Sequence, residues 1–287
     1  KKLGLRPLAV HFDNGWNSEL SVMNIENLVK KLDIDLFTYV VDWPEFKDIQ
    51  LSFLKASTPD SEIPTDHAIF AILRKIQRKY KVKYVLNGIN LRTEGHHPLS
   101  WSQGHSDFGY IKDVHKRFGT KKIKTYPHGN IFTIFEDMLS KKWVNILNYI
   151  DYNKEEAKRI IVEELDWRDY GGKHFESIYT RFYQGYILPK KFGIDKRKMH
   201  FSSLICAGEI TRDKALEYLK EEPYPLDMQK EDLEYVIKKF GISALEFQKL
   251  MGLPKRTYFD YKSYYGRFLH KRKLIKLLKI IYLTIFK

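Results

Sequence analysis

Within the first 90 residues, short apolar runs alternate with longer amphipathic stretches, and this alternation restricts the chain to few folds. Three runs have the β-branched or aromatic content of buried strands: residues 7–13, 36–42 and 82–88. Helices are expected at residues 19–32, capped by Asn17 or Ser18, and in two stretches that begin near Trp43 and at Pro64. A strand–helix–strand order is typical of a parallel sheet covered by helices on both faces. We therefore predict the α/β class, with a doubly wound parallel sheet.

From about residue 136 the pattern changes to helices with clear stop signals. Two pairs have the spacing of a capping box: Asn153 with Glu156, and Ser243 with Glu246. Gly252 followed by Pro254 marks the end of the second of these helices. We expect two domains, an α/β domain over residues 1–135 and a mostly helical region over residues 136–287 that could supply specificity.

Cys206 is the only cysteine of the 287 residues, which excludes an internal disulfide and a CxxC zinc site. It lies in the apolar segment SSLICAG, which favours a buried and unreactive thiol. No apolar stretch reaches the roughly 20 residues that cross a bilayer, and no signal peptide opens the sequence. These features predict a folded cytoplasmic protein.

The net charge of +14 is concentrated near the C-terminus, where residues 251–287 hold ten Lys or Arg and one Asp. Such a segment could meet nucleic acid, anionic lipid or a phosphorylated ligand, or be a solvated helix packed on its own domain. Residues 268–287 could lie on a membrane surface, with helix packing or partner docking as the alternative. The chain opens Lys-Lys-Leu-Gly, which reads as the end of a helix, so we expect it to be the later part of a longer protein.

Polar residues follow the first predicted strand, at the edge where ligands bind in parallel sheets. The segment HFDNGW places Asp13, Asn14 and Gly15 there, where either the rim of a ligand pocket or an Asx turn would account for them. Thr65 and Asp66 are further candidates for this rim, unless they only cap the helix that begins beside them.

The segment NGINLRTE, residues 87–94, is the most informative because it follows the third strand at the same edge. Gly88 would let the backbone approach a ligand closely. Thr93 and Glu94 offer a hydroxyl and a carboxylate, the hard oxygen ligands that Mg²⁺ prefers beside substrate phosphates. A polar turn before a capped helix is the structural alternative.

The loop 95–109 contains three histidines whose spacing matches no closed zinc site: His96, His97 and His105. Asp107 in this loop is a candidate second acid for the cation that Glu94 would hold. Lys124, in KKIKTYP, could contact phosphate, and an exposed strand edge protected by lysines is the alternative.

Residues 166–215 interleave basic and aromatic side chains. Basic groups there could clamp a diphosphate while aromatic rings stack on a base or a sugar: Arg168, Lys173, His174, Arg181, Lys190 and Arg197. Single-stranded RNA would suit the same composition, and a charged helical surface is the alternative.

Together these segments resemble the N-acetyl sugar amidotransferase family of bacterial surface-polysaccharide biosynthesis. The resemblance covers most of the chain and is carried by GLRPLAVHFDNGWNSELSVMNIENL, EIPTDHAIFAIL, YVLNGINLRTEG, VHKRFGT, LNYIDYNKEEAKRII, WRDYGGKHFESIYTRFYQGYILPKKFGIDKRK and SLICAGEITRDKAL. That family is similar to the wider PP-loop ATP pyrophosphatases, which implies an adenine nucleotide alpha-hydrolase-like fold.

The resemblance implies an AMP-forming reaction that converts the N-acetyl group of a nucleotide-linked sugar into an acetamidino group, for lipopolysaccharide, O-antigen or a related surface glycan. ATP adenylates the carboxamide oxygen, and ammonia then displaces AMP. ATP and Mg²⁺ are the implied cofactors. The implied partners are a separate glutaminase subunit and a cyclase-like ammonia-channel protein.

Carried over by position, GINLRTE resembles the GTxNxxE stretch of related synthetases, with Ile89 where they have a threonine. The resemblance implies that Gly88 and Asn90 line the nucleotide site and that Glu94 holds Mg²⁺. It also implies functional positions outside this stretch: Asp13 near the adenosine, Asp107 as a second cation ligand, and Lys124 on a phosphate.

The family's SGGxDS phosphate loop, expected just before Leu3, is absent from the sequence, so this chain alone would bind ATP poorly. Two other functions compete with the sugar amidotransferase. One is a tRNA-modifying PP-loop enzyme of the lysidine-synthase type, suggested by the basic tail. The other is a non-catalytic scaffold for a glutaminase partner.

Overall fold

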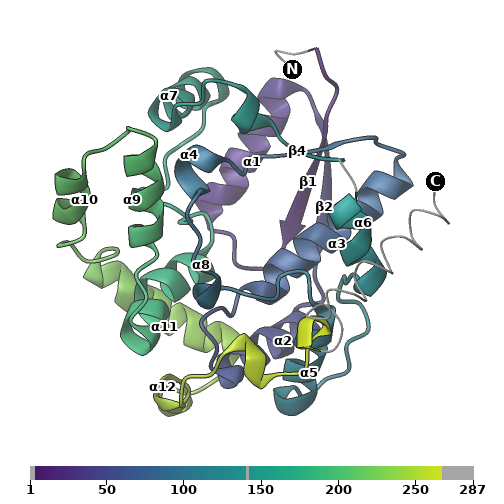
Figure 1. Ribbon diagram of the computed structural model, residues 1–287, viewed down its shortest axis with the longest axis vertical. Coiled ribbons are helices and arrows are strands. Elements are labelled where there is room, and N and C mark those ends of the chain that lie inside the picture. Colours follow the sequence, from purple (N-terminus) through teal and green to yellow (C-terminus); the bar gives the residue numbers. More distant parts are fainter. Residues whose placement is uncertain (1–3, 140–141, 267–287) are drawn as a thin grey trace. The chain divides into compact units, whose positions relative to one another are not determined.

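The computed structural model describes residues 4–139 and 142–266, in two compact units that interleave along the chain (Figure 1). The first unit is drawn from Lys1–Val41, Leu86–Pro98 and Asn145–Met251. The second is drawn from Asp42–Val85, Leu99–Val144 and Gly252–Lys287. The domain boundary at residue 135 stays a prediction.

The first unit opens with a β–α–β arrangement. Its parts are β1 (Leu8–Asp13), α1 (Glu19–Leu32) and β2 (Asp35–Val40). The strands pair in parallel, with Leu8 opposite Asp35 and Asp13 opposite Val40, and Figure 1 shows them side by side. The Ser18 hydroxyl caps α1 by accepting a backbone N–H three residues on, at 3.2 Å. Two predicted strands, the helix between them and its cap are therefore confirmed.

Most of the rest of the first unit is helical. The helices are α4 (Leu91–Glu94), α7 (Lys154–Leu165), α8 (Ile178–Phe182), α9 (Arg197–Cys206), α10 (Arg212–Tyr218), α11 (Leu226–Phe240) and α12 (Ala244–Gly252), with a 3₁₀ turn η2 (Ile146–Tyr149) and a π-helical stretch η3 (Tyr183–Phe192). Asn153 caps α7 through the N–H of Glu156 at 2.9 Å. Ser243 and Glu246 bond reciprocally at the start of α12, as their spacing predicts.

Trp16 anchors the core of the first unit. It is fully buried, and its indole stacks on Tyr179 with ring centroids 5.0 Å apart and meets Phe240 edge-on at 5.2 Å. Because Tyr179 belongs to α8 and Phe240 to α11, the turn that follows β1 is tied to the helical part of the unit.

The second unit is built from helices and ordered loops. Its elements are α2 (Trp43–Ala56), α3 (Ile63–Lys79), α5 (Phe108–Phe118) and α6 (Ile131–Leu139), with 3₁₀ turns η1 (Leu99–Trp101) and η4 (Tyr258–Asp260). α2 packs on α5, where Phe53 and Tyr110 meet edge-to-face at 5.4 Å. Both predicted helix starts are confirmed. Thr65 and Asp66 lie inside α3 and no side chain caps it, so the helix-cap interpretation of these two residues is wrong.

Residues 119–126 fold around acidic side chains of α2. The buried Glu45 carboxylate accepts the N–H groups of Lys124, Thr125 and Tyr126 at 2.8 to 3.0 Å. Burial raises the pKa of Glu45, but these donors outweigh it and hold the pKa below its usual value. The strand edge considered for Lys124 does not form, because the N–H groups that a ladder would use are bound to a carboxylate.

A second sheet joins β3 (Val85–Asn87) and β4 (Trp143–Asn145), and the division between the units passes through both strands. β3 is shorter than the predicted strand 82–88, since the Val82 N–H returns to the Gln77 carbonyl at the end of α3. The described strands thus form two sheets of two strands, and the doubly wound parallel sheet stays a prediction.

Cys206 is exposed, so the expectation of a buried thiol is wrong. The residue is the last of α9, and Leu204, two positions earlier, takes the buried side of this helix. Two positions correspond to about 200° around a helix, so an apolar segment still has an outward face. The Cys206 sulfur lies 3.8 Å from Nε2 of His96.

No helix within residues 4–139 and 142–266 combines the length and the apolar character that crossing a membrane requires. The segment 268–287, the candidate for membrane-surface binding, lies outside the described residues.

Candidate functional site

The turn after β1 is an Asx turn. The Asp13 carboxylate accepts the N–H of Gly15 at 2.8 Å, and the Asn14 side-chain oxygen accepts the N–H of Trp16 at 3.2 Å. Gly15 has φ +80°, a conformation that favours glycine. The polar residues of HFDNGW therefore fold the strand end and seat Trp16 in the core. A role of Asp13, Asn14 and Gly15 in nucleotide binding stays a prediction.

The segment 87–94 forms an open turn that leads into α4. Asn90 caps the helix by accepting the N–H of Thr93 at 2.9 Å, and its amide donates to the Thr93 hydroxyl at 3.0 Å. Gly88 lies in open space, because a Cβ placed there would meet no atom within 4 Å. The turn is thus held by its own polar side chains and leaves its glycine uncovered.

Glu94, the last residue of α4, pairs with Lys173 at 3.2 Å. Both side chains are about one-third exposed, with relative accessibilities of 34% and 29%, so the pair is reached by solvent. Sequence reasoning selected both residues for different roles, Glu94 for the cation and Lys173 for the substrate. The fold brings them together although 79 positions separate them.

Two further basic side chains interact with Lys173 of this pair, Lys154 at the start of α7 and His200 on α9. We call Glu94, Lys154, Lys173 and His200 the Glu94 cluster. Burial lowers the pKa of Lys154, and the positive charge of Lys173 lowers it further. Two half-buried lysines that repel each other would be stabilised by an anion, so the cluster suits phosphate oxygens.

His200 contacts the backbone of this turn. Its Nδ1 lies 3.0 Å from the carbonyl oxygen of Thr93. Burial lowers the pKa of His200 to about 4, and the charge of Lys173 contributes to the lowering. His200 is therefore neutral near pH 7 and acts as a hydrogen-bonding group that holds the Thr93–Glu94 peptide in place.

The other basic candidates have partners of their own. Arg181 binds the buried Asp232 through two bonds of 2.7 Å, and Arg197 binds Asp195 and three backbone carbonyls. Lys190 lies 3.8 Å above the Tyr186 ring, His174 lies 3.4 Å from Glu176, and the exposed Arg168 reaches the sulfur of Met23. Of the six, Lys173 forms the ion pair with Glu94, and His174 acts electrostatically on His200 of the cluster.

Four sequence candidates lie in the second unit: Thr65, Asp66, Asp107 and Lys124. The Asp107 carboxylate is buried and accepts four hydrogen bonds, from the N–H groups of Tyr110, Tyr264 and Tyr265 and from the Tyr258 hydroxyl, at 2.7 to 3.2 Å. Asp107 is the cap of α5. Asp66 lies 3.0 Å from Nδ1 of His105, and the Lys124 side chain is exposed. Within the described part of the chain, no three acidic, His or Cys side chains are grouped to hold a metal.

Sequence reasoning missed two members of this neighbourhood. Lys154 and the nearby Tyr152 lie in LNYIDYNKEEAKRII, which contributed to the resemblance but not to the site. Burial raises the pKa of the Tyr152 hydroxyl, and the negative charges of Glu209 and Glu94 raise it further. The density of Tyr, Asn and Lys before a capped helix was the available signal.

Comparison with family models gave a match in the C-terminal part of the sequence. Residues 176–276 match the model described as LPS biosynthesis protein WbpG-like, C-terminal domain. This match supports the surface-polysaccharide family and points to a protein of lipopolysaccharide biosynthesis. The WbpG-like region covers about a third of the 287 residues and includes His200, but not the turn that carries Glu94. A comparison with curated proteins found no match.

Proposed function

We propose that this protein is an ATP-dependent amidotransferase of surface-polysaccharide biosynthesis, which converts the N-acetyl group of a nucleotide-linked sugar into an acetamidino group. The observation that carries the proposal is the Glu94–Lys173 pair beside Lys154, next to an uncovered glycine turn. The WbpG-like match supports the polysaccharide setting. The doubly wound ATP-pyrophosphatase fold is part of the proposal.

In this proposal, Lys154 and Lys173 bind phosphate oxygens of ATP and of the departing pyrophosphate. Gly88 lets the nucleotide approach the backbone, and the neutral His200 keeps the Thr93–Glu94 peptide in position. The carboxamide oxygen of the substrate forms a bond to the α-phosphorus while the bond to pyrophosphate breaks. Ammonia then adds to the activated carbon, AMP leaves with the oxygen, and a proton is lost.

Glu94 suits Mg²⁺ because this ion is held by one or two carboxylates together with substrate phosphates and water. Only one of its oxygens has an ion-pair partner within the described residues, Lys173. Mg²⁺ bound there would neutralise charge on the β- and γ-phosphates. Asp107 does not fit this role in the structure described, since its four hydrogen bonds fill the carboxylate.

The ammonia would come from a glutaminase subunit through a channel protein, and free ammonium salt replaces both in a test. We would supply the protein with ATP, Mg²⁺, ammonium and UDP-N-acetylglucosamine, and measure AMP and pyrophosphate. Glu94→Gln should lower AMP formation about 100-fold or more, the usual cost of removing a group that stabilises transition-state charge. Lys173→Met should raise the ATP concentration needed for half-maximal rate.

The matched control is Glu163→Gln, which makes the same change on the exposed surface of α7, where Glu163 forms an ion pair with Arg159. This variant should retain the full rate. An unchanged rate in Glu94→Gln would remove Glu94 from the reaction. AMP formation that depends on tRNA and not on the sugar would replace the proposal with a tRNA-modifying enzyme.

A further inference from the structure

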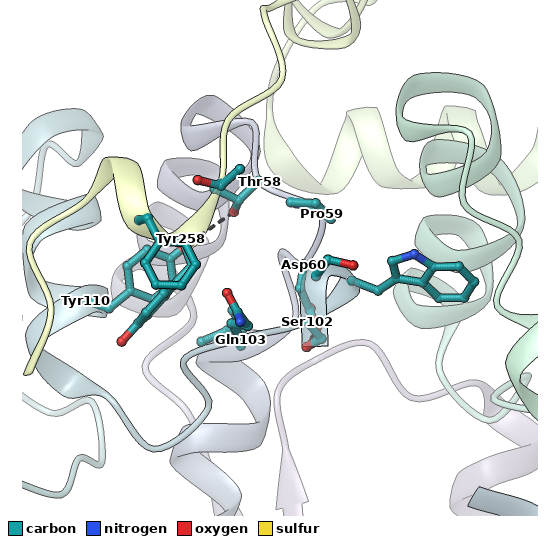
Figure 2. A pocket seen from close by; sticks show the side chains of 12 residues that line it. Thr58, Pro59, Asp60, Ser102, Gln103, Tyr110 and Tyr258 are labelled. Carbon is teal, nitrogen blue, oxygen red and sulfur yellow. Dashed lines mark hydrogen bonds between the residues drawn. The ribbon is translucent and has the colours of Figure 1, made fainter. Parts of the chain in front are cut away.

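The second unit contains a small pocket of about 160 Å³, distinct from the Glu94 cluster of the first unit. It lies where the loop after α2 meets the loop after η1 and the turn η4 (Figure 2). The side chains that define its chemistry are Asp60, Ser102, Gln103, Tyr110, Tyr258 and Phe259. Every one of these residues belongs to the second unit, so the pocket is complete within it.

One wall of the pocket is a polar pair with spare acceptor capacity. Asp60 is 3% exposed, and its carboxylate accepts the N–H of Glu62 at 2.9 Å and the hydroxyl of Ser102. Nε2 of His105 also lies 3.8 Å from this carboxylate. A carboxylate has about four acceptor sites, so at least one remains for a ligand. Ser102 lies 2.5 Å from Nε2 of His105, whose Nδ1 lies 3.0 Å from Asp66. This chain of bonds fixes the pair in place before any ligand arrives.

Gln103 supplies the complementary groups. Its side chain is half-buried, and within the described residues its amide makes no hydrogen bond. Figure 2 shows it between Tyr258 and the Asp60–Ser102 pair, where both N–H groups and the carbonyl oxygen are available. The pocket thus offers donors as well as acceptors to one small ligand.

The opposite wall is aromatic and rigid. The Tyr258 ring contacts Tyr110 at 4.8 Å, and its hydroxyl donates to Asp107, so the ring cannot swing away. Phe259 lines the pocket with 65% of its surface exposed. A fixed ring and an exposed one provide an apolar surface for one face of a ligand.

The lining excludes several ligand classes. Among the described residues, the lining contains no Lys or Arg and a single carboxylate, which disfavours phosphate and other anions. Drug-sized sites begin at about 300 Å³, so the pocket is too small for a whole nucleotide. A neutral group with several hydroxyls on one side and an apolar face on the other fits the two walls.

We infer that this pocket binds a sugar ring, with Asp60 and Gln103 on its hydroxyls and Tyr258 and Phe259 on its apolar face. The inference rests on the proposed function for the identity of the ligand, which is then the sugar part of the nucleotide-linked substrate. The pocket itself needs no ATP or ammonia, so its binding can be measured apart from the reaction.

The test uses saturation-transfer NMR on the 287-residue chain, with N-acetylglucosamine and UDP-N-acetylglucosamine as probes. Gln103→Leu keeps the size of the side chain and removes its polar groups, and should weaken sugar binding about tenfold or more. Phe259→Ala removes an exposed ring and should reduce saturation transfer to the protons of the sugar ring. Gln248→Leu makes the same change on an exposed position of α12 and should bind like the wild type.

Equal sugar affinity in Gln103→Leu and the wild type would overturn the inference. So would displacement of the sugar by inorganic phosphate, or tighter binding of tetramethylammonium than of the sugar at this pocket. The proposed function fails separately. If the wild type forms no AMP but Gln103→Leu still weakens sugar binding, the sugar pocket stands and the proposed reaction fails. If the wild type forms AMP but Gln103→Leu binds the sugar normally, the reaction stands and the sugar pocket fails.

Discussion

The two turns 88–94 and 104–107 each contain a glycine and end in an acidic residue, yet they differ in how far other side chains of the protein cover them. In the turn 104–107, Gly104 has φ +100° and is covered by the rings of Tyr110 and Tyr258, and Asp107 accepts four hydrogen bonds. In the turn 88–94, Gly88 is uncovered and Glu94 has one ion pair at the surface. Side chains of the protein fill the first turn, whereas the second is left open.

This difference indicates that the Asp107 carboxylate stabilises the fold, whereas the Glu94 carboxylate is accessible to a ligand. A buried carboxylate whose lone pairs are filled by its own chain stabilises the fold, and a ligand could reach it only by breaking those bonds. A carboxylate with one exposed ion pair costs little to release. The two turns also share a feature, since a histidine with its pKa lowered to about 4 contacts a carbonyl oxygen in each, His67 on His105 and His200 on Thr93.

The largest effect is expected for Gly104→Ala. A Cβ at this position would lie 2.8 Å from the rings of Tyr110 and Tyr258, and φ +100° is strained for alanine. Strain and overlap together should lower the free energy of unfolding by about 3 kcal/mol, measured by urea denaturation. Gly171→Ala, with φ +85° and no atom within 4 Å, isolates the strain and should cost less. Equal losses in the two variants would mean that the rings do not cover Gly104.

The next largest effect is expected for Asp107→Asn. The amide that replaces one oxygen would face N–H and O–H donors, so several hydrogen bonds to a buried charge are lost. The free energy of unfolding should fall by about 2 to 4 kcal/mol. The control is Asp151→Asn, whose side chain is 92% exposed in its pair with Arg92, and its unfolding should change by less than about 0.5 kcal/mol. A small loss for Asp107→Asn would restore Asp107 as a ligand candidate.

Acid should weaken both turns through their histidines. Burial lowers the pKa of His67 from 6.5 to about 4, so the unfolded chain binds more protons than the folded one between these pH values. The stability from the neutral His67 is therefore complete above pH 6.5 and is lost as pH falls toward 4. His67→Gln should flatten this part of the stability–pH curve. The curve comes from urea unfolding at a series of pH values.

A smaller effect on stability is expected for Glu94→Gln. Loss of the partly exposed pair with Lys173 should lower the free energy of unfolding by at most about 1 kcal/mol. Because the pair is reached by solvent, part of this difference should disappear at high salt. Unfolding of both proteins in urea with and without 1 M NaCl provides the measurement. A loss as large as that of Asp107→Asn would show that Glu94 is a structural residue.

The two turns also show which features of the fold and of the site could be predicted from the sequence alone. Local signals predicted β1, α1, β2 and the caps at Asn153 and Ser243, because periodicity and cap chemistry act over a few residues. Glu94 and Lys173 were both selected as polar candidates from local patterns, but their pairing depends on how α4 meets the loop before α8. No local pattern indicated that Tyr258, Tyr264 and Tyr265 would donate hydrogen bonds to the Asp107 carboxylate.

Other misses have the same origin. Arg181 and Arg197 are of the residue type expected to bind phosphate, yet Arg181 is paired with Asp232 and Arg197 with Asp195. Lys154 was missed because its neighbours along the chain are an ordinary capped helix, and its lowered pKa comes from burial and from Lys173. Whether a charged side chain is available is decided by tertiary contacts, which single-sequence patterns do not encode.

The smallest effect on stability, and the sharpest test of the open turn, is expected for Gly88→Ala. A methyl group there meets no atom within 4 Å, so unfolding in urea should change by a few tenths of a kcal/mol or show slight stabilisation. If the nucleotide approaches this backbone, the same methyl group should weaken ATP binding about tenfold, measured by calorimetry. The substitution would then weaken ATP binding without changing the free energy of unfolding. Gly104→Ala cannot separate these two quantities, because its methyl group would overlap with side chains of the protein itself. Unchanged ATP binding in a stable Gly88→Ala variant would mean that the open turn does not contact the nucleotide.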